Sequence, residues 1–213
     1  MYYNYKILGV GHPRTGTAYT SKLLQYFGLN VGHETLMEDG IVAWQMLLPF
    51  ENFQENGLPW MNPKDIDWSK LRFDTVVYNV RNPKDSIGSI IATENSSYPF
   101  RCQIIDFKQA KNIVEKTIIS IIGFDEIIKQ KYRDHFVYRV EDQKDLLGEY
   151  ISSKYNTKKD TKTQQPNNNY NTIKHRKNYK PIDFSFEEID EKYIKMLKTY
   201  CKEYGYDNTF LDM

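Results

Sequence analysis

The 213-residue sequence has only two cysteines, Cys102 and Cys201. They form neither a C-x-x-C pair nor a spaced zinc set, and the sequence therefore offers no metal site built on cysteine. Two isolated cysteines are typical of free thiols in a reducing compartment. We expect both to be free and no metal to be required.

The sequence also lacks a strong charge of either sign and any long apolar run. It has 29 basic and 28 acidic residues, which argues against a general nucleic-acid binder and a polybasic membrane protein. No apolar run reaches the length of a membrane span, and the N-terminal segment has no signal-peptide core. With 40% hydrophobic residues, the chain can bury a core. We expect one cytoplasmic domain over residues 1–213 that binds neither nucleic acid nor membrane.

Segments typical of strands alternate with segments typical of helices, which predicts an α/β fold with a central parallel sheet between two helical layers. A polar, low-complexity stretch at 156–172 predicts a flexible loop. An apolar segment at 40–50 is assigned to a helix, and 52–70 to a loop. The expected strands are 5–10, 29–34, 73–80 and 136–140, and the other expected helices are 18–27, 82–94, 107–131, a segment ending near 155, and 187–204.

A glycine-bearing turn, GHPRTGT, follows the first expected strand and satisfies G-x-x-x-x-G through Gly11 and Gly16. Such a turn points backbone N–H groups and a helix N-terminus at an anion, as in P-loops. A nucleotide triphosphatase places Lys and then Ser or Thr after the second glycine, where this chain has Thr17 and Ala18. The cation is instead Arg14. The turn predicts an anion site poorly suited to metal-assisted phosphoryl transfer.

The segment PRTGTAY, Pro13 to Tyr19, resembles the 5′-phosphosulfate loop of PAPS-dependent sulfotransferases, P-[KR]-[ST]-G-[TS]-[TS]-[WLY]. PAPS is 3′-phosphoadenosine-5′-phosphosulfate, and PAP is its product. The resemblance implies a P-loop three-layer sandwich, with the 5′-phosphosulfate bound by five consecutive residues: Arg14, Thr15, Gly16, Thr17 and Ala18. Ala18 departs from the usual second hydroxyl.

A second segment, RNPKDSIGS, follows the most β-prone stretch of the chain. It resembles the 3′-phosphate segment of the same family, R-[ND]-P-[KR]-D-x-x-x-S. The resemblance implies that Arg81 and Ser89 bind the 3′-phosphate. Arginine suits this role because its planar guanidinium forms a bidentate fork with phosphate. Asp85, in the first turn of the next helix, favours the helix dipole.

Transfer to a hydroxyl requires a base, and Gly32-His33-Glu34-Thr35 resembles the segment where several branches of the family place a catalytic glutamate. Glu34 is the preferred base and His33 the rival. In a regular strand, neighbouring side chains point to opposite faces, so at most one of the two should face the donor.

The later part of the chain holds weaker matches. Arg176 and Lys177, in a basic stretch, are similar to the nucleotide-closing loop of the family but lack its glycine. FVYRVED, residues 136–142, resembles a later strand whose acidic residues are expected to cap the next helix.

The expected function is sulfuryl transfer from PAPS to a hydroxyl of a small molecule, a carbohydrate or a peptide. Glu34 would act as base and Arg14 would stabilise the leaving group. The acceptor pocket is expected from residues 34–70 and from loops without a motif. Two alternatives remain open: a P-loop nucleotide kinase or NTPase, and a non-catalytic PAP(S)-binding module.

Overall fold

The computed structural model describes residues 1–49, 67–167, 182 and 184–212. Helices and strands alternate along the chain, with short 3₁₀ turns (η) between some of them. In chain order they are β1 (Tyr3–Val10), α1 (Thr17–Tyr26), β2 (Val31–His33), β3 (Gly40–Val42), η1 (Trp44–Leu47), η2 (Trp68–Lys70), β4 (Leu71–Val80), α3 (Pro83–Ile91), α4 (Glu94–Arg101), α5 (Ile113–Lys131), β5 (Phe136–Arg139), α6 (Lys144–Tyr155), α7 (Glu191–Tyr204) and η4 (Thr209–Leu211).

The five strands form one sheet in the order β2-β3-β1-β4-β5, and every pair of neighbours is parallel. This confirms the predicted α/β fold with a central parallel sheet flanked by helices. The long register between β1 and β4 places Val10 beside Tyr78. The loops that leave these two central strands therefore begin side by side, at the carboxyl edge of the sheet where ligands bind in such folds.

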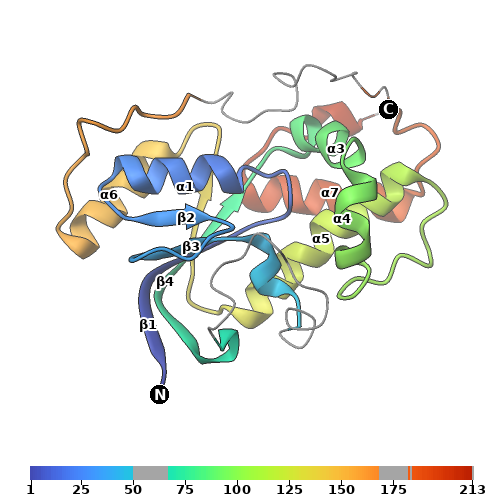
Figure 1. Cartoon of the computed structure of the whole chain (residues 1–213). Helices are drawn as coiled ribbons and strands as arrows, with labels where there is room; N and C mark the ends of the chain where they lie inside the picture. Colours follow the sequence, from blue (N-terminus) through green and yellow to red (C-terminus); the bar gives the residue numbers. More distant parts are fainter. Residues whose placement is uncertain (50–66, 168–181, 183, 213) are drawn as a thin grey trace.

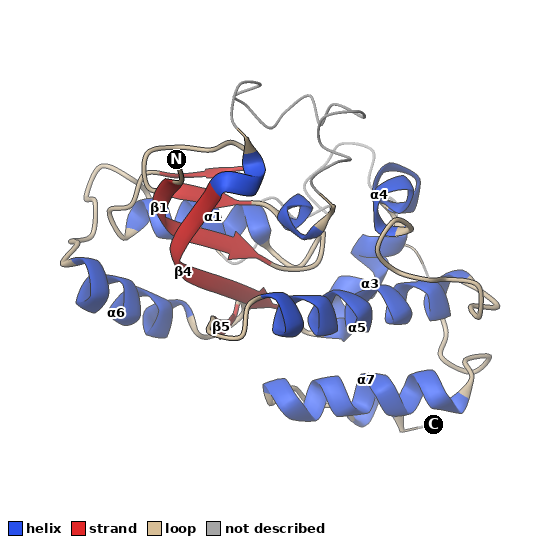
Figure 2. Cartoon of the chain, turned by 90° about the horizontal axis from the view of Figure 1, so that it is seen from below, coloured by secondary structure: helices blue, strands red, loops and turns tan. Residues whose placement is uncertain are grey.

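The two faces of the sheet bury different residues because side chains alternate along a strand. Ile7 and Val77 face a cluster that includes Leu23 and Leu24 of α1 and Ile151 of α6. Their neighbours in the strands face a second cluster with α5 and η1, which includes Leu8, Tyr78, Trp44, Phe124 and Ile128. Figure 1 shows α1 beside α6, while Figure 2 shows α5 with one end beside the sheet and the rest extending away from it, toward α3 and α4. The sheet is thus covered on both faces, as predicted.

A third cluster joins α3, α5 and α7 beyond the sheet. Ile87 of α3, Ile118 of α5 and Leu197 of α7 are fully buried within it. Figure 1 shows these helices grouped at the opposite end of the molecule from α6. The segment that begins at Arg81 is therefore held between the sheet and a packed helical layer.

The prediction of a helix over 40–50 is wrong. Residues Gly40–Val42 form a strand that pairs with β1 and β2, and only a 3₁₀ turn follows. Gly40 has φ 142, and a Cβ added there would lie 1.9 Å from the Ile7 carbonyl oxygen. Only glycine permits this approach. A short apolar run does not distinguish a buried strand from a helix, which explains the error.

Several helix ends also differ from the prediction. The helix after β4 ends at Ile91 rather than near residue 94, and a separate helix, α4, follows it. Helix α5 begins at Ile113 instead of residue 107 because the Asn112 side chain caps the N–H groups of Val114 and Glu115. Helix α7 begins at Glu191 instead of residue 187, after the cap Asp190. At its other end, Gly205 adopts φ 69 and stops the helix as expected.

The described part of the predicted flexible loop, residues 156–167, contains no helix or strand. It is joined to α1 by a hydrogen bond from the Asp160 N–H to the Tyr26 carbonyl oxygen, 2.8 Å. Residues 168–172 lie outside the described residues. None of the helices in the described ranges has the length and apolar character that crossing a bilayer demands.

Candidate functional site

The candidate site lies where β1 and β4 end. The chain leaves β1 toward the face covered by α1 and leaves β4 toward α3, α4 and α5, and ligands of such folds bind where neighbouring connections diverge in this way. Gly11 begins the first connection against Asn79 of β4. A Cβ at residue 11 would lie 2.6 Å from Asn79 Nδ2 and 2.8 Å from the Asn79 carbonyl oxygen. Glycine is therefore required where the loop meets the strand.

Residues 11–17 are called here the 11–17 loop, and the carbonyl groups of residues 12–16 within it accept hydrogen bonds from protein donors. The His12 carbonyl accepts from both the N–H and the hydroxyl of Thr15, at 3.0 and 2.7 Å. The other four acceptors have one or two donors each: Pro13 O from His12 Nδ1 (2.6 Å), Arg14 O from Arg81 Nη1 (3.2 Å), Thr15 O from Asn79 Nδ2 (3.1 Å), and Gly16 O from the N–H (2.8 Å) and Oγ1 (3.0 Å) of Thr20. Five successive carbonyl oxygens are thus satisfied by the protein.

This arrangement suits an anion. Arg14 adopts φ 77 and Gly16 φ 105, a backbone path that turns the loop sharply before α1. No side chain caps the N-terminus of α1. The first N–H groups of a helix have no partner within the helix, and they carry partial positive charge. With its carbonyl oxygens bound elsewhere, the loop presents donors rather than acceptors, as phosphate-binding loops do.

The structure brings the two predicted motifs together. Arg14 Nε donates to Ser89 Oγ at 3.1 Å, and Arg81 Nη1 donates to the Arg14 carbonyl. Residues predicted for the 5′ and 3′ ends of one nucleotide are therefore neighbours, although 67 positions separate Arg14 from Arg81. Thr15 is the exception among the predicted ligand residues. Both its N–H and its hydroxyl donate to His12 O, so Thr15 shapes the loop.

Comparison with known proteins gives one distant likeness. No protein-family model matches the chain, and no curated protein matches it. Among solved structures it is similar to mouse sulfotransferase SULT7A1 complexed with PAP. The identity is 13% and the TM-score 0.36 over 70% of this chain, and the chain spans 58% of the length of that protein. At these values the likeness assigns no family, and the assignment depends on the residues themselves.

Both candidate bases lie beside the 11–17 loop. His33 ends β2, and Glu34 follows it with φ 54, outside the strand conformation. The expectation that at most one of them faces the donor assumed a regular strand, and the backbone at Glu34 is not regular. The left-handed turn at Glu34 brings its Oε1 to 4.0 Å from His33 Nε2. The two side chains thus form one close pair.

The pair is held in place by two further side chains. His33 Nε2 lies 3.2 Å from the hydroxyl of Thr17, the first residue of α1. Gln45 Nε2 donates to Glu34 Oε1 at 2.8 Å. Burial lowers the pKa of His33; the nearby Glu34 carboxylate opposes this shift, and the Arg14 guanidinium adds to it. His33 is therefore mostly neutral at pH 7 and can accept a proton.

Three residues at the site were missed from the sequence. Asn79 donates to both the carbonyl and the hydroxyl oxygen of Thr15. Gln45 orients Glu34. Glu141 accepts from the Asn82 N–H at 2.8 Å and from the Tyr206 hydroxyl at 3.1 Å, and so holds the segment that begins at Arg81. For Asn79 and Gln45 a signal existed, since a buried polar residue inside an apolar strand or run requires a specific partner.

The predicted capping role of the acidic residues after β5 is wrong. Glu141 binds Asn82 and Tyr206, and Asp142 pairs with Arg139 at 2.6 Å. Helix α6 begins after Gln143 without a side-chain cap. The acidic pair therefore ties β5 to the second motif and to the C-terminal segment.

Some predicted features lie outside the described residues. Arg176 and Lys177 belong to these, as do residues 50–66 of the expected acceptor region. The described part of that region supplies Glu34 and Gln45 to the site. Of Thr17 and Ala18, the first contacts His33, and both lie in the uncapped first turn of α1.

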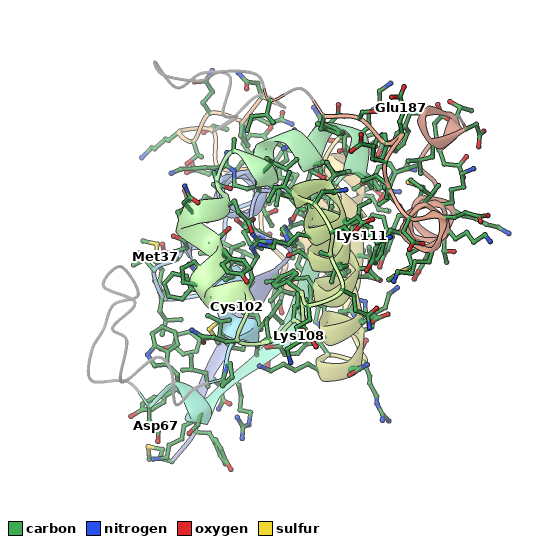
Figure 3. The ribbon with its side chains drawn as sticks, turned by 90° about the vertical axis from the view of Figure 1, so that its right-hand side faces the viewer. Met37, Asp67, Cys102, Lys108, Lys111 and Glu187 are labelled. Carbon is green, nitrogen blue, oxygen red and sulfur yellow. The ribbon has the colours of Figure 1, made fainter. Side chains whose placement is uncertain are left out.

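A cavity of about 680 Å³ lies between the end of α4 and the start of α5, away from the predicted nucleotide residues. Tyr98, Cys102, Lys108 and Lys116 line it. Figure 3 shows Cys102 and Lys108 on this side of the molecule. None of the residues that line it belongs to either motif, so it is separate from the anion site.

Proposed function

We propose that this chain is a sulfotransferase that moves a sulfuryl group from PAPS to an acceptor hydroxyl. The observation that supports this most directly is the meeting of the two motifs. Arg14 contacts Ser89, and Arg81 contacts the backbone of Arg14. One ligand with two anionic ends accounts for both motifs, whereas a nucleotide without a 3′-phosphate would leave the phosphate-binding resemblance of the second motif unexplained.

The proposed donor site has two halves. The N–H groups of Gly16, Thr17 and Ala18, together with Arg14, bind the 5′-phosphosulfate. Arg81 and Ser89 bind the 3′-phosphate. Because Ser89 Oγ already accepts from Arg14, its hydroxyl proton can be donated to a phosphate oxygen while the bond to Arg14 is kept. One serine can thus serve both ends of the nucleotide.

The proposed reaction is an in-line displacement at sulfur. The acceptor oxygen forms a bond to sulfur as the bond from sulfur to the 5′-phosphate oxygen breaks, which yields a sulfate ester and PAP. Arg14 and the N-terminus of α1 stabilise the charge that develops on the departing phosphate. The acceptor proton passes to a base, and no metal ion is required.

Glu34 is the proposed base, with His33 as its partner. The Gln45 bond fixes one carboxylate oxygen of Glu34, and Oε2 is the atom proposed to take the proton. The contact of Thr17 Oγ1 with His33 Nε2, next to the first turn of α1, supports the part proposed for His33. The acceptor is a hydroxyl compound, a small molecule, a carbohydrate or a peptide, that enters beside this pair. The proposed compartment is the cytoplasm.

Thermal unfolding with PAP and with Mg-ATP tests the donor assignment. A ligand at 100 times its dissociation constant stabilises by about 2.7 kcal/mol, roughly 5–10 °C for a domain of this size. PAP should give such a shift and Mg-ATP a much smaller one. Equal shifts would remove the reason for a 3′-phosphate site.

Acceptor screening with radiolabelled PAPS then tests the chemistry. Transfer of label to a hydroxyl acceptor is the expected result. Hydrolysis of ATP that depends on magnesium would instead identify a kinase or NTPase. Tight PAP binding without transfer to any acceptor would identify a non-catalytic binding module.

A further inference from the structure

A buried polar chain runs from the 11–17 loop to helices α4 and α5. His12 is 3% exposed, and Ser120 of α5 and Arg101 of α4 are fully buried. His12 Nε2 lies 2.7 Å from Ser120 Oγ, and Arg101 Nη1 donates to the same oxygen at 2.7 Å. Arg101 is also paired with Glu94 and donates from Nε to Ser97 Oγ.

Hydrogen-bond chemistry fixes the direction of this chain. A carbonyl oxygen only accepts, so His12 Nδ1, 2.6 Å from Pro13 O, carries the proton. In the neutral ring Nε2 is then the acceptor, and the Ser120 hydroxyl donates to it. Ser120 Oγ in turn accepts from Arg101. With His12 neutral, each group can therefore make these bonds in one arrangement only.

Burial and the positive charge of Arg101 keep His12 in that state. Together they lower its pKa from 6.5 to about 3. The Phe124 ring, 4.8 Å away between centroids, contacts the imidazole edge-on and restricts its rotation. The imidazole therefore has a fixed position, a fixed tautomer and a fixed charge.

We propose that His12 is a positioning residue for the anion site: it turns the Pro13 carbonyl away from the ligand, and Ser120 and Arg101 hold it there. A carbonyl oxygen that faced the phosphosulfate would repel it. The loop carbonyls before and after Pro13 are held by Thr15 and by Arg81, so His12 controls the remaining one between them. Helices α4 and α5 thus set the shape of the 11–17 loop. The identity of the ligand rests on the proposed function; the control of the loop does not.

Two serines that both bind Arg101 provide a matched comparison. Ser120→Ala removes the link between Arg101 and His12, whereas Ser97→Ala removes a bond to the same guanidinium without touching His12. Hydrogen exchange of a peptide that covers residues 11–17 should become about tenfold faster in Ser120→Ala, the effect of one lost hydrogen bond. It should stay at the parent rate in Ser97→Ala.

A second series removes the bonds of His12 itself. His12→Asn keeps a donor near Pro13 O and loses Ser120, while His12→Leu loses both. PAP should bind about tenfold more weakly to His12→Asn and to Ser120→Ala, and more weakly again to His12→Leu. The double variant His12→Asn/Ser120→Ala should be no weaker than either single variant, because both changes break the same bond.

Equal effects of Ser97→Ala and Ser120→Ala on loop exchange would overturn the positioning role, as would fully additive losses in the double variant. If the parent protein binds no PAP, the proposed function fails. The exchange comparison still decides the role of His12 in that case, because it needs no ligand.

Discussion

Arg14 Nε donates to Ser89 Oγ at 3.1 Å, a bond between the first turn after β1 and the second turn of α3. It joins the two segments that resemble the 5′ and the 3′ binding motifs. The hydroxyl of Ser89 orients the guanidinium of Arg14. A change at Ser89 should therefore weaken the binding of both the 5′ group and the 3′-phosphate of a nucleotide.

Ser89→Ala should therefore weaken the binding of PAP more than that of AMP, which differs from PAP only in lacking the 3′-phosphate. The loss for PAP should be about 1.5–3 kcal/mol, because a bond to a charged group and the orientation of Arg14 are both removed. AMP should lose about 1 kcal/mol of binding free energy, because only the orientation of Arg14 is affected. Calorimetric titration measures both. Ser86→Ala, a buried serine one turn earlier in α3, is the control and should bind both ligands as the parent does.

Arg81→Ala should also weaken PAP binding more than AMP binding. The difference should be smaller than for a residue that contacts only the 3′-phosphate. Arg81 Nη1 lies 3.2 Å from the Arg14 carbonyl oxygen. Removal of the Arg81 side chain should therefore reduce the binding free energy of AMP by about 1 kcal/mol and that of PAP by about 1.5–3 kcal/mol. Arg81→Lys should recover part of the difference, since a point charge lacks the guanidinium fork. Equal penalties on the two ligands would make Arg81 a structural residue of the loop.

Glu34→Gln should leave PAP affinity within a few-fold and reduce turnover by roughly 10²–10⁴, the usual contribution of a general base. The amide keeps an oxygen for Gln45 Nε2, so the local structure is retained. Single-turnover assays with PAPS and an identified acceptor measure the effect. If His33→Ala produces that loss while Glu34→Gln does not, the base is His33.

The close pairing of His33 and Glu34 was not predictable from the sequence. Period-two alternation placed them on opposite faces, and only the left-handed backbone at Glu34 brings them together. That conformation is rare for a residue other than glycine, and its cost of about 1–3 kcal/mol is met by tertiary contacts that a local pattern does not record. Outliers of this kind cluster at functional sites, which fits the proposed role of the pair.

The loop and strands that carry the motifs were predictable because their signals are local. Gly11 and Gly16 mark the turn after β1, and the β-branched and aromatic residues of β4 identify a buried strand. The contacts that join the motifs are not local. The bond from Asn79 to Thr15 spans 64 positions and the bond from Arg101 to Ser120 links two helices. Such partners follow from the packing of α3, α4 and α5 against the sheet.

Acid should destabilise the protein partly through His12, whose pKa burial and Arg101 lower from 6.5 to about 3. Below pH 6.5 this histidine binds a proton in the unfolded chain but not in the folded one. Its contribution to stability is therefore complete above pH 6.5, falls as the pH drops toward 3, and changes no further below that. A difference of one bound proton between the unfolded and folded states changes the free energy of unfolding by about 1.4 kcal/mol per pH unit.

His12→Asn removes this titrating group and keeps a donor near Pro13 O, so the variant isolates the effect. Urea unfolding between pH 4 and 7.5 gives the free energy of unfolding of both proteins. The variant should be less stable at pH 7.5, but its stability should fall less steeply, with the difference in slope approaching about 1.4 kcal/mol per unit below pH 6. The carboxylates and His33 are present in both proteins, so their contributions to the pH dependence of stability cancel in the comparison. Parallel curves would mean that His12 can take up a proton in the folded state, and that outcome contradicts the fixed neutral tautomer on which its hold on Pro13 depends.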